Sequence, residues 1–316
     1  MHGRRMRWAR PVLITIALVA ASGVAADGGH ADPRPHGYLA LGDSVPFGFN
    51  PLIDKRDPTK FIGYPEDAAT QLGMALTNAS CPGEASGGFI SLTGADNSCR
   101  PFRAAFPLHV SYQGSQLDFA LASLRSHPRT TLVSLTLGAN DLFVCQKTTR
   151  DHCASPVEVA ATLATYERNL TTILSAIRAV YRQQLVTLTY YSIDDRDPAT
   201  TRTVAALNAV IATVTARFDG EVANGFTAFA RAAARDGDNC TAGLLRKYPD
   251  DTCDIHPSAT GARLLAGALV AAVHRRASRR TTSKDGHSWS VRLEPSWLTW
   301  ACAERACSRE RTSSGV

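Results

Sequence analysis

Two long apolar runs limit most strongly what this chain can fold into. The segments "TTLVSLTLG" at residues 130–138 and "LVTLTYYS" at residues 185–192 are rich in β-branched and apolar residues along their whole length. Strands with such continuous apolar runs, without an alternation of apolar and polar residues, are usually covered on both faces, as in parallel sheets. We therefore expect both runs to lie inside a parallel sheet.

Weaker signals surround these two strands. Shorter strands are expected at 38–41, 75–79 and 221–223, and helices at 113–124, 155–181, 199–218 and 257–275. The helix near residue 155 has a clear start, because Ser155, Pro156 and Glu158 suit the cap, the first position and the first turn. Alternating strands and helices imply a parallel sheet with helices on both faces. In such sheets ligands bind beyond the carboxyl ends of the strands.

The two ends of the 316-residue chain differ from its middle. Four arginines precede an apolar run at 11–26, which ends in the small residues Val24, Ala25 and Ala26. This pattern predicts a signal peptide at 1–26, with cleavage after Ala31 or an uncleaved anchor as alternatives. We expect a flexible leader at 27–36, one folded domain at 37–276 and a basic, disordered tail at 277–316, whose tryptophans could instead form a docking patch.

The net charge of +6 is concentrated at these ends. Residues 1–26 carry +4 and residues 275–316 carry +5, whereas residues 27–274 carry −3. A nucleic-acid-binding protein should carry its basic charge on the folded domain. The distribution therefore argues against a nucleic-acid partner. We also expect no stable membrane span once the signal is removed.

Eight cysteines indicate a disulfide framework. An even number of cysteines in an exported chain is typical of disulfides. Their order suggests that neighbours pair, although the sequence does not prove the connectivity. Zinc is disfavoured, because no Cys-x-x-Cys pair exists and the spacings match no familiar zinc site, so we expect no metal and no cofactor. The suggested pairs are Cys81–Cys99, Cys145–Cys153, Cys240–Cys253 and Cys302–Cys307.

Polar residues that can support catalysis follow the expected strands. Ser44 follows the first strand, Gly83 the second and Asn140 the third, while Asp254 and His256 precede the last helix. Each could separately be a turn, cap or packing residue. Together they supply every group that ester hydrolysis needs.

In that reaction each residue would have a distinct role. Ser44 would be the nucleophile, His256 the base and Asp254 the group that orients the base. The backbone N–H groups of Ser44 and Gly83 and the side-chain amide of Asn140 would form an oxyanion hole.

This set of residues resembles the SGNH (GDSL-type) hydrolase family. Its blocks match "GDS" at 42–44, Gly83 in "CPGEAS", "GAND" at 138–141 and the pair His256 and Pro257, in the family's order. The resemblance covers residues 38 to about 275. Within the family, the wider sequence pattern is similar to that of secreted, disulfide-bonded members. It implies a three-layer α/β/α sandwich with a five-stranded parallel sheet, of the flavodoxin-like kind.

The chain departs from the family pattern beside the histidine. The usual Asp-x-x-His block would place an acid at position 253, which is Cys253 here. Asp254 lies only two residues before His256, so Asp250, Asp251 or a backbone carbonyl remain alternatives for orienting the ring. The Gly-x-Ser-x-Gly elbow of α/β-hydrolases is absent from the sequence.

These observations predict a secreted, monomeric serine esterase or lipase that acts on a small-molecule or lipid ester. The same residues would serve a thioesterase, a carbohydrate deacetylase, a phospholipase or an acyltransferase. A non-catalytic binding protein is a further alternative, although it would be expected to have lost one of the catalytic residues. The segment 49–63 follows the nucleophile closely and should shape the pocket.

Overall fold

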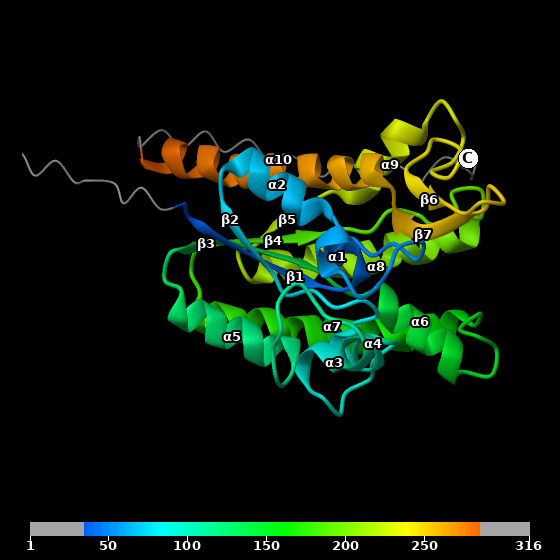
Figure 1. Ribbon diagram of the computed structural model, residues 1–316, viewed down its shortest axis with the longest axis horizontal. Coiled ribbons are helices and arrows are strands. Elements are labelled where there is room, and N and C mark those ends of the chain that lie inside the picture. The colour runs from blue at the N-terminus through cyan, green and yellow to red at the C-terminus, as the bar shows by residue number, and fades with distance from the viewer. Residues whose placement is uncertain (1–34, 285–316) are drawn as a thin grey trace, which may run out of the picture. The chain divides into compact units, whose positions relative to one another are not determined.

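The apolar runs of the sequence form the middle of a five-stranded parallel sheet, shown in the computed structural model of Figure 1. The model describes residues 35–284. Its strand order β2-β1-β3-β4-β5 is the doubly wound order of flavodoxin-like folds. The predicted fold class is therefore confirmed. The strands are β1 (Gly37–Gly42), β2 (Ala75–Asn78), β3 (Thr130–Thr136), β4 (Gln184–Leu188) and β5 (Glu221–Ala223).

Helices cover both faces of this sheet and make three layers (Figure 1). One face carries α2, α9 and α10, and the other carries α3, α5, α7 and α8. The helices are α1 (Ser44–Phe47), α2 (Tyr64–Leu72), α3 (Ser86–Ile90), α4 (Cys99–Ala105), α5 (Gln116–Ser126), α6 (Ala139–Thr148), α7 (Pro156–Val180), α8 (Pro198–Arg217), α9 (Gly225–Ala233) and α10 (Ala259–Lys284), with a 3-10 turn at Pro58–Lys60.

The central strand β3 is almost completely buried, and its polar side chains are satisfied by tyrosines. Ser134 Oγ lies 2.7 Å from the Tyr38 hydroxyl, and Thr136 Oγ1 lies 2.8 Å from the Tyr64 hydroxyl. Burying a hydroxyl without a partner would destabilise the fold. These pairs therefore allow polar residues to occupy a strand that is covered on both faces.

The observed ends of two helices can be compared with those predicted from the sequence. Ser155 caps α7, because its Oγ accepts a hydrogen bond from Val157 N at 3.2 Å. The last helix, α10, begins at Ala259 rather than 257, and it continues to Lys284. Its final residues belong to the segment predicted as a disordered tail, so that boundary needs correction. Residues 1–34 and 285–316, with the predicted signal, most of the leader and the rest of the tail, lie outside the described residues.

A short antiparallel pair, β6 (Leu245–Lys247) and β7 (Cys253–Pro257), was not predicted. The segment that the sequence suggested as a loop before the last helix is instead an extended strand that ends at Pro257. β7 matters for function because it carries Asp254 and His256.

Three disulfides join neighbouring cysteines along the chain. They are the pairs that the order of the cysteines suggested, and the fourth pair, Cys302 and Cys307, lies outside the described residues. One of the three ties β7 to the segment that precedes β6. The bonds are Cys81–Cys99, Cys145–Cys153 and Cys240–Cys253.

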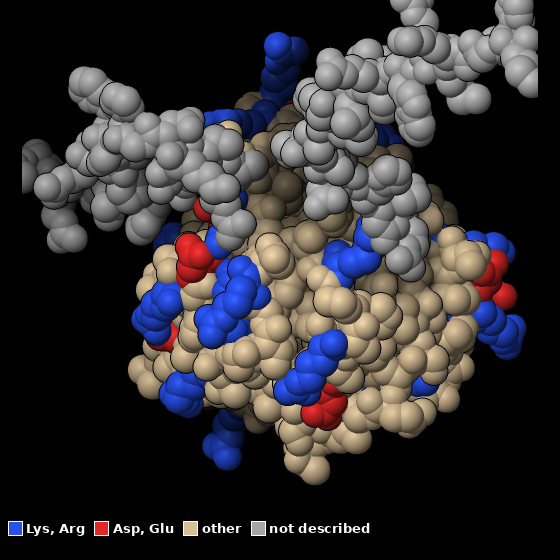
Figure 2. All heavy atoms as spheres, turned by 90° about the vertical axis from the view of Figure 1, so that its left-hand side faces the viewer, with Lys and Arg blue, Asp and Glu red and all other residues tan. Residues whose placement is uncertain are grey.

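The side of the domain at which β1 begins has dispersed charges. On the visible part of this face, Lys and Arg side chains stand apart from one another, and acidic side chains lie beside several of them (Figure 2). Arg276 pairs there with Asp219 near the end of α10. Within residues 35–284, no helix combines the length and apolarity needed to cross a bilayer.

Candidate active site

Four residues from distant parts of the sequence meet at the carboxyl edge of the sheet. Ser44, Gly83, Asn140 and His256 line one cavity of about 860 Å³. They lie on segments that follow β1, β2 and β3 or, for His256, on β7. The volume is in the range typical of small-molecule sites. The structure thus brings the predicted nucleophile, base and oxyanion donors together.

The turn between β1 and α1 presents Ser44 to the cavity. Gly42 ends the strand with φ of +129°, and a Cβ added there would lie 1.9 Å from the Thr136 carbonyl oxygen. Only glycine therefore fits this position. Asp43 Oδ1 accepts a hydrogen bond from Val45 N at 2.9 Å and so caps the following turn of helix. Ser44 is left as the first residue of α1, partly exposed in the cavity.

A hydrogen-bonded chain connects Ser44 to a carboxylate. His256 Nε2 lies 2.9 Å from Ser44 Oγ, and His256 Nδ1 hydrogen-bonds Asp254 Oδ1. Asp254 also accepts hydrogen bonds from His256 N at 3.0 Å and from the Tyr248 hydroxyl at 3.0 Å. Of the alternatives that the sequence left open, the structure places Asp254 against the ring.

The extended conformation of β7 explains how an Asp-x-His spacing can work. Residues i and i+2 of a strand point to the same side, so Asp254 and His256 face one another along β7. The residue between them, Ile255, points away, and its carbonyl accepts a hydrogen bond from the Tyr191 hydroxyl at 2.7 Å. The disulfide from Cys253 to Cys240 holds the start of this strand.

Asp254 is held in its ionised form. Burial by itself raises the pKa of a carboxyl group, but the hydrogen bonds and charge of His256, together with the Tyr248 hydroxyl, outweigh it and lower the pKa of Asp254 below its usual value. An ionised carboxylate at this position fixes the tautomer of His256 in which Nε2 can accept a proton from Ser44.

Three potential hydrogen-bond donors belong to residues that line the same cavity, namely Ser44, Gly83 and Asn140. Ser44 N–H belongs to the first turn of α1, where backbone N–H groups have no acceptor within the helix. Gly83 has φ of +84°, and a Cβ there would lie 2.7 Å from Ser98 Cβ. Asn140, at the start of α6, is 5% exposed and contributes its side-chain amide. Donors in such an arrangement can bind a developing negative charge.

The buried Asp43 and the partly buried Asp141 tie the surrounding loops together. Burial raises the pKa of Asp43 to about 6, although the Tyr190 hydroxyl that hydrogen-bonds Asp43 Oδ2 opposes the shift. Burial likewise raises the pKa of Asp141 to about 6, and Asp141 Oδ2 accepts a hydrogen bond from Ser86 N at 3.0 Å. Their carboxylates thus bind residues of other loops.

A buried glutamine supports the turn between β1 and α1, called the nucleophile turn because it carries the predicted nucleophile Ser44. Sequence reasoning missed this glutamine. Gln116 Oε1 accepts a hydrogen bond from Gly42 N at 2.6 Å, and Gln116 Nε2 donates to Gly42 O at 3.0 Å. The amide therefore pairs with both backbone polar groups of Gly42, the last residue of β1. The one local signal is the capping box of Ser115 and Asp118, which identifies the helix start but not the contact.

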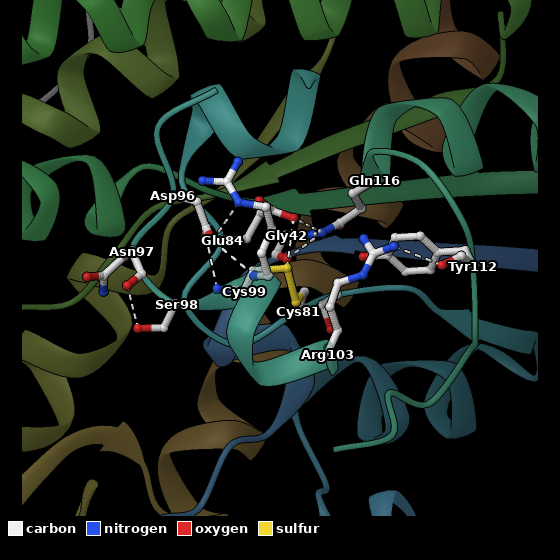
Figure 3. Close-up of a disulfide and its surroundings, with 12 residues drawn as sticks. Gly42, Cys81, Glu84, Asp96, Asn97, Ser98, Cys99, Arg103, Tyr112 and Gln116 are labelled. Atoms are coloured by element: carbon white, nitrogen blue, oxygen red, sulfur yellow. Dashed lines mark hydrogen bonds and ion pairs between the residues drawn. A yellow bond between two sulfur atoms is a disulfide. The ribbon is translucent and has the colours of Figure 1, made fainter. Parts of the chain in front are cut away.

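Beside Gln116, a buried acid contacts the Cys81–Cys99 disulfide (Figure 3). Glu84 Oε2 lies 3.2 Å from Gln116 Nε2 and 3.3 Å from the Cys99 sulfur. Burial raises the pKa of Glu84 to about 8, and the neighbouring Asp96 carboxylate adds to the shift. Glu84 directly follows Gly83, so this network supports the nucleophile turn and one oxyanion donor at the same time.

Comparison with known families identifies the family to which this chain belongs. Residues 40–264 match the model of the GDSL-like Lipase/Acylhydrolase family. The chain belongs to this family. This GDSL-like enzyme is accordingly a carboxylic ester hydrolase. No curated protein sequence matches the GDSL-like chain.

Solved structures with a similar fold include three lipolytic enzymes. Phospholipase A1 from Streptomyces albidoflavus NA297 is 19% identical with a TM-score of 0.52, and it covers 77% of this GDSL-like chain and 99% of its own. The extracellular lipase from Streptomyces rimosus is 21% identical with a TM-score of 0.51, covering 75% and 99%. The lipase Lip_vut3 from a goat rumen metagenome is 15% identical with a TM-score of 0.50, covering 75% and 97%.

We predict that Glu84 makes the GDSL-like enzyme less stable as the pH rises. The pKa of this group is about 8 in the fold and 4.5 ordinarily, so between these values the folded state holds a proton that the unfolded state has lost. The free energy of unfolding should therefore fall as the pH rises through this window, by up to about 1.4 kcal/mol per pH unit.

Denaturant unfolding between pH 6 and 8, with the disulfides intact, measures this slope. Asp43 and Asp141 contribute in the same direction mainly below pH 6, so the upper half of the window isolates Glu84. Glu84→Gln should flatten the dependence there. An equal slope in the wild type and in Glu84→Gln would contradict the assignment.

Proposed function

We propose that the enzyme cleaves carboxylic esters through an acyl-enzyme on Ser44. Ser44 Oγ attacks the ester carbonyl carbon while its proton passes to His256 Nε2. His256 then returns this proton to the leaving alcohol oxygen, and the acyl group stays on Ser44. In the second half, His256 takes a proton from water, the resulting hydroxide attacks the acyl carbon, and Ser44 Oγ leaves with the proton.

The observation that carries this proposal is the contact of His256 with both Ser44 and Asp254. The 2.9 Å separation of Ser44 Oγ from His256 Nε2 is within the range for direct proton transfer. The ionised Asp254 on the other side of the ring stabilises the imidazolium that forms after that transfer.

The oxyanion of each tetrahedral intermediate would be bound by Ser44 N–H, Gly83 N–H and Asn140 Nδ2. In comparable sites, removal of one such donor lowers kcat by about 10²- to 10³-fold. Hydrogen bonds that strengthen as charge develops on the oxygen act on the transition state rather than on the bound ester. These three donors therefore complete the reaction without a metal.

We further propose that the acyl chain lies between α6 and α8. The cavity is lined by one face of each helix, with apolar positions Leu142 and Phe143 on α6 and Val204 and Leu207 on α8. Val204 and Leu207 are three residues apart. Leu142 and Phe143 lie three residues from the lining residues Ala139 and Gln146, so each set lies on one helix face. This apolar part of the cavity between α6 and α8 favours an acyl group several carbons long over acetate.

We also propose that the enzyme is secreted after removal of residues 1–26. The support is the basic and apolar start of the chain and the three disulfides of the described domain. Disulfides of this number persist in oxidising compartments and are rare in the cytosol. A lipolytic enzyme outside the cell would meet lipid and small-molecule esters directly.

Replacement of the nucleophile tests the main proposal. Wild type and Ser44→Ala are recovered from the medium of a secreting bacterial host, where a mass lacking residues 1–26 checks the export. Because Ser44 is partly exposed, the variant should keep the wild-type melting temperature while turnover of p-nitrophenyl butyrate falls by at least about 10⁴-fold. Undiminished turnover would refute the role of Ser44.

Narrowing the apolar part of the cavity between α6 and α8 tests where the acyl chain binds. Val204→Trp should lower kcat/KM for p-nitrophenyl octanoate relative to the acetate by at least about tenfold, because the longer chain loses apolar contacts. The matched control is Val157→Trp, at a position that is 76% exposed and does not line the cavity. An unchanged octanoate-to-acetate ratio in Val204→Trp would contradict the placement.

A further inference from the structure

Asn97 contacts both of the oxyanion donors that come from loops other than the nucleophile turn. Asn97 Nδ2 donates to Asn140 Oδ1 at 2.7 Å. Asn97 N donates to the Gly83 carbonyl at 3.1 Å, and Ser98 N donates to the same oxygen at 3.2 Å. One residue therefore links the backbone of Gly83 to the side chain of Asn140.

The disulfide fixes the segment that carries Asn97. Cys99, two residues after Asn97, is bonded to Cys81, two residues before Gly83. Figure 3 shows Asn97 and Ser98 beside this bond on the segment that leads into α4. The two hydrogen bonds to the Gly83 carbonyl and the disulfide therefore hold the same two segments together at either end.

Lys147 sets the direction of the hydrogen bonds. Lys147 Nζ on α6 donates to Asn97 Oδ1 at 2.5 Å. An ammonium group can only donate, so Asn97 must turn its oxygen to Lys147 and its NH₂ group to Asn140. Asn140 in turn must present its oxygen to Asn97, which leaves its own NH₂ group on the side of Asp43, at the cavity that Ser44 also lines.

At the other end of this row of hydrogen bonds, Asn140 meets a group that can only accept. Asn140 Nδ2 lies 3.4 Å from Asp43 Oδ2, and an ionised carboxylate can only accept hydrogen bonds. A donor-only group at Lys147 and an acceptor-only group at Asp43 thus impose one orientation on both amides between them. The long contact to Asp43 leaves Asn140 Nδ2 able to donate strongly to another acceptor.

We propose that Asn97 is a positioning residue of the oxyanion hole and that Lys147 acts through it by fixing the orientation of both amides. This inference rests on the proposed function of Gly83 and Asn140. It assigns to Lys147 an effect on the reaction rate that its exposed position on α6 would not suggest.

An isosteric substitution separates positioning from structural support. In Asn97→Asp, both side-chain oxygens can only accept, so Asn140 should rotate its NH₂ group toward position 97 and away from the oxyanion. Lys147 would at the same time gain an ion pair, which preserves the packing. We expect kcat for p-nitrophenyl butyrate to fall about 10²-fold, with KM within about threefold and an undiminished melting temperature.

The matched control for this change is Asn224→Asp. Asn224 is exposed, caps α9 by accepting a hydrogen bond from Thr227 N at 2.8 Å, and does not line the cavity. Aspartate is an equally good helix cap, so this control should keep wild-type kcat. Wild-type kcat in Asn97→Asp would overturn the proposal.

A double-mutant cycle tests whether Lys147 acts through Asn97. Lys147→Met alone should lower kcat about 3- to 10-fold, whereas Lys60→Met, a control lysine outside the cavity lining, should not. In an Asn97→Ala background, Lys147→Met should have no further effect.

An undiminished effect of Lys147→Met in that background would overturn the proposal, and the cycle decides even if Asn97→Asp fails to fold. If the proposed function itself were wrong, the wild type would show no ester turnover that depends on Ser44. That result is distinguishable from a wild type that is active together with an Asn97→Asp variant of unchanged kcat.

Discussion

The contact between Ser44 and His256 is the interaction on which the site depends, because it joins segments 212 residues apart in the sequence. Ser44 directly follows the buried strand β1 and its end at Gly42, whereas His256 lies on a strand of a separate two-stranded sheet. The Cys240–Cys253 disulfide and the hydrogen bond from the Tyr191 hydroxyl to the Ile255 carbonyl hold that strand in position. The 2.9 Å separation thus reflects the placement of a small, disulfide-tethered element against a rigid core.

The oxyanion side of the site is anchored independently of the histidine. The Cys81–Cys99 disulfide, the Gln116 amide and the buried Glu84 hold the segment that contains Gly83 against the end of β1. In one network these groups connect the backbone beside the nucleophile with the backbone of an oxyanion donor. Gly83, a proposed oxyanion donor, and His256, the proposed base, therefore lie on segments that are held by different disulfides.

The sequence predicts the sheet well because apolar β-branched runs are sufficient to mark buried strands. It predicts less well where an element depends on long-range contacts. β4 ends at Leu188, and the expected strand residue Tyr190 instead contacts Asp43. β6 and β7 are short and polar, so only their pairing and a disulfide reveal them as strands. Asn97 and Lys147 lack any local signal, since their importance arises entirely from the residues that the fold places next to them.

Covalent labelling of Ser44 tests most directly the central claim that this serine is an activated nucleophile. A fluorophosphonate probe reacts with a serine only when that serine is activated and the resulting oxyanion is stabilised. Peptide mapping by mass spectrometry after labelling at neutral pH should find the probe on Ser44 alone, with labelling abolished in His256→Ala. Labelling of another residue, or none at Ser44, would contradict the account.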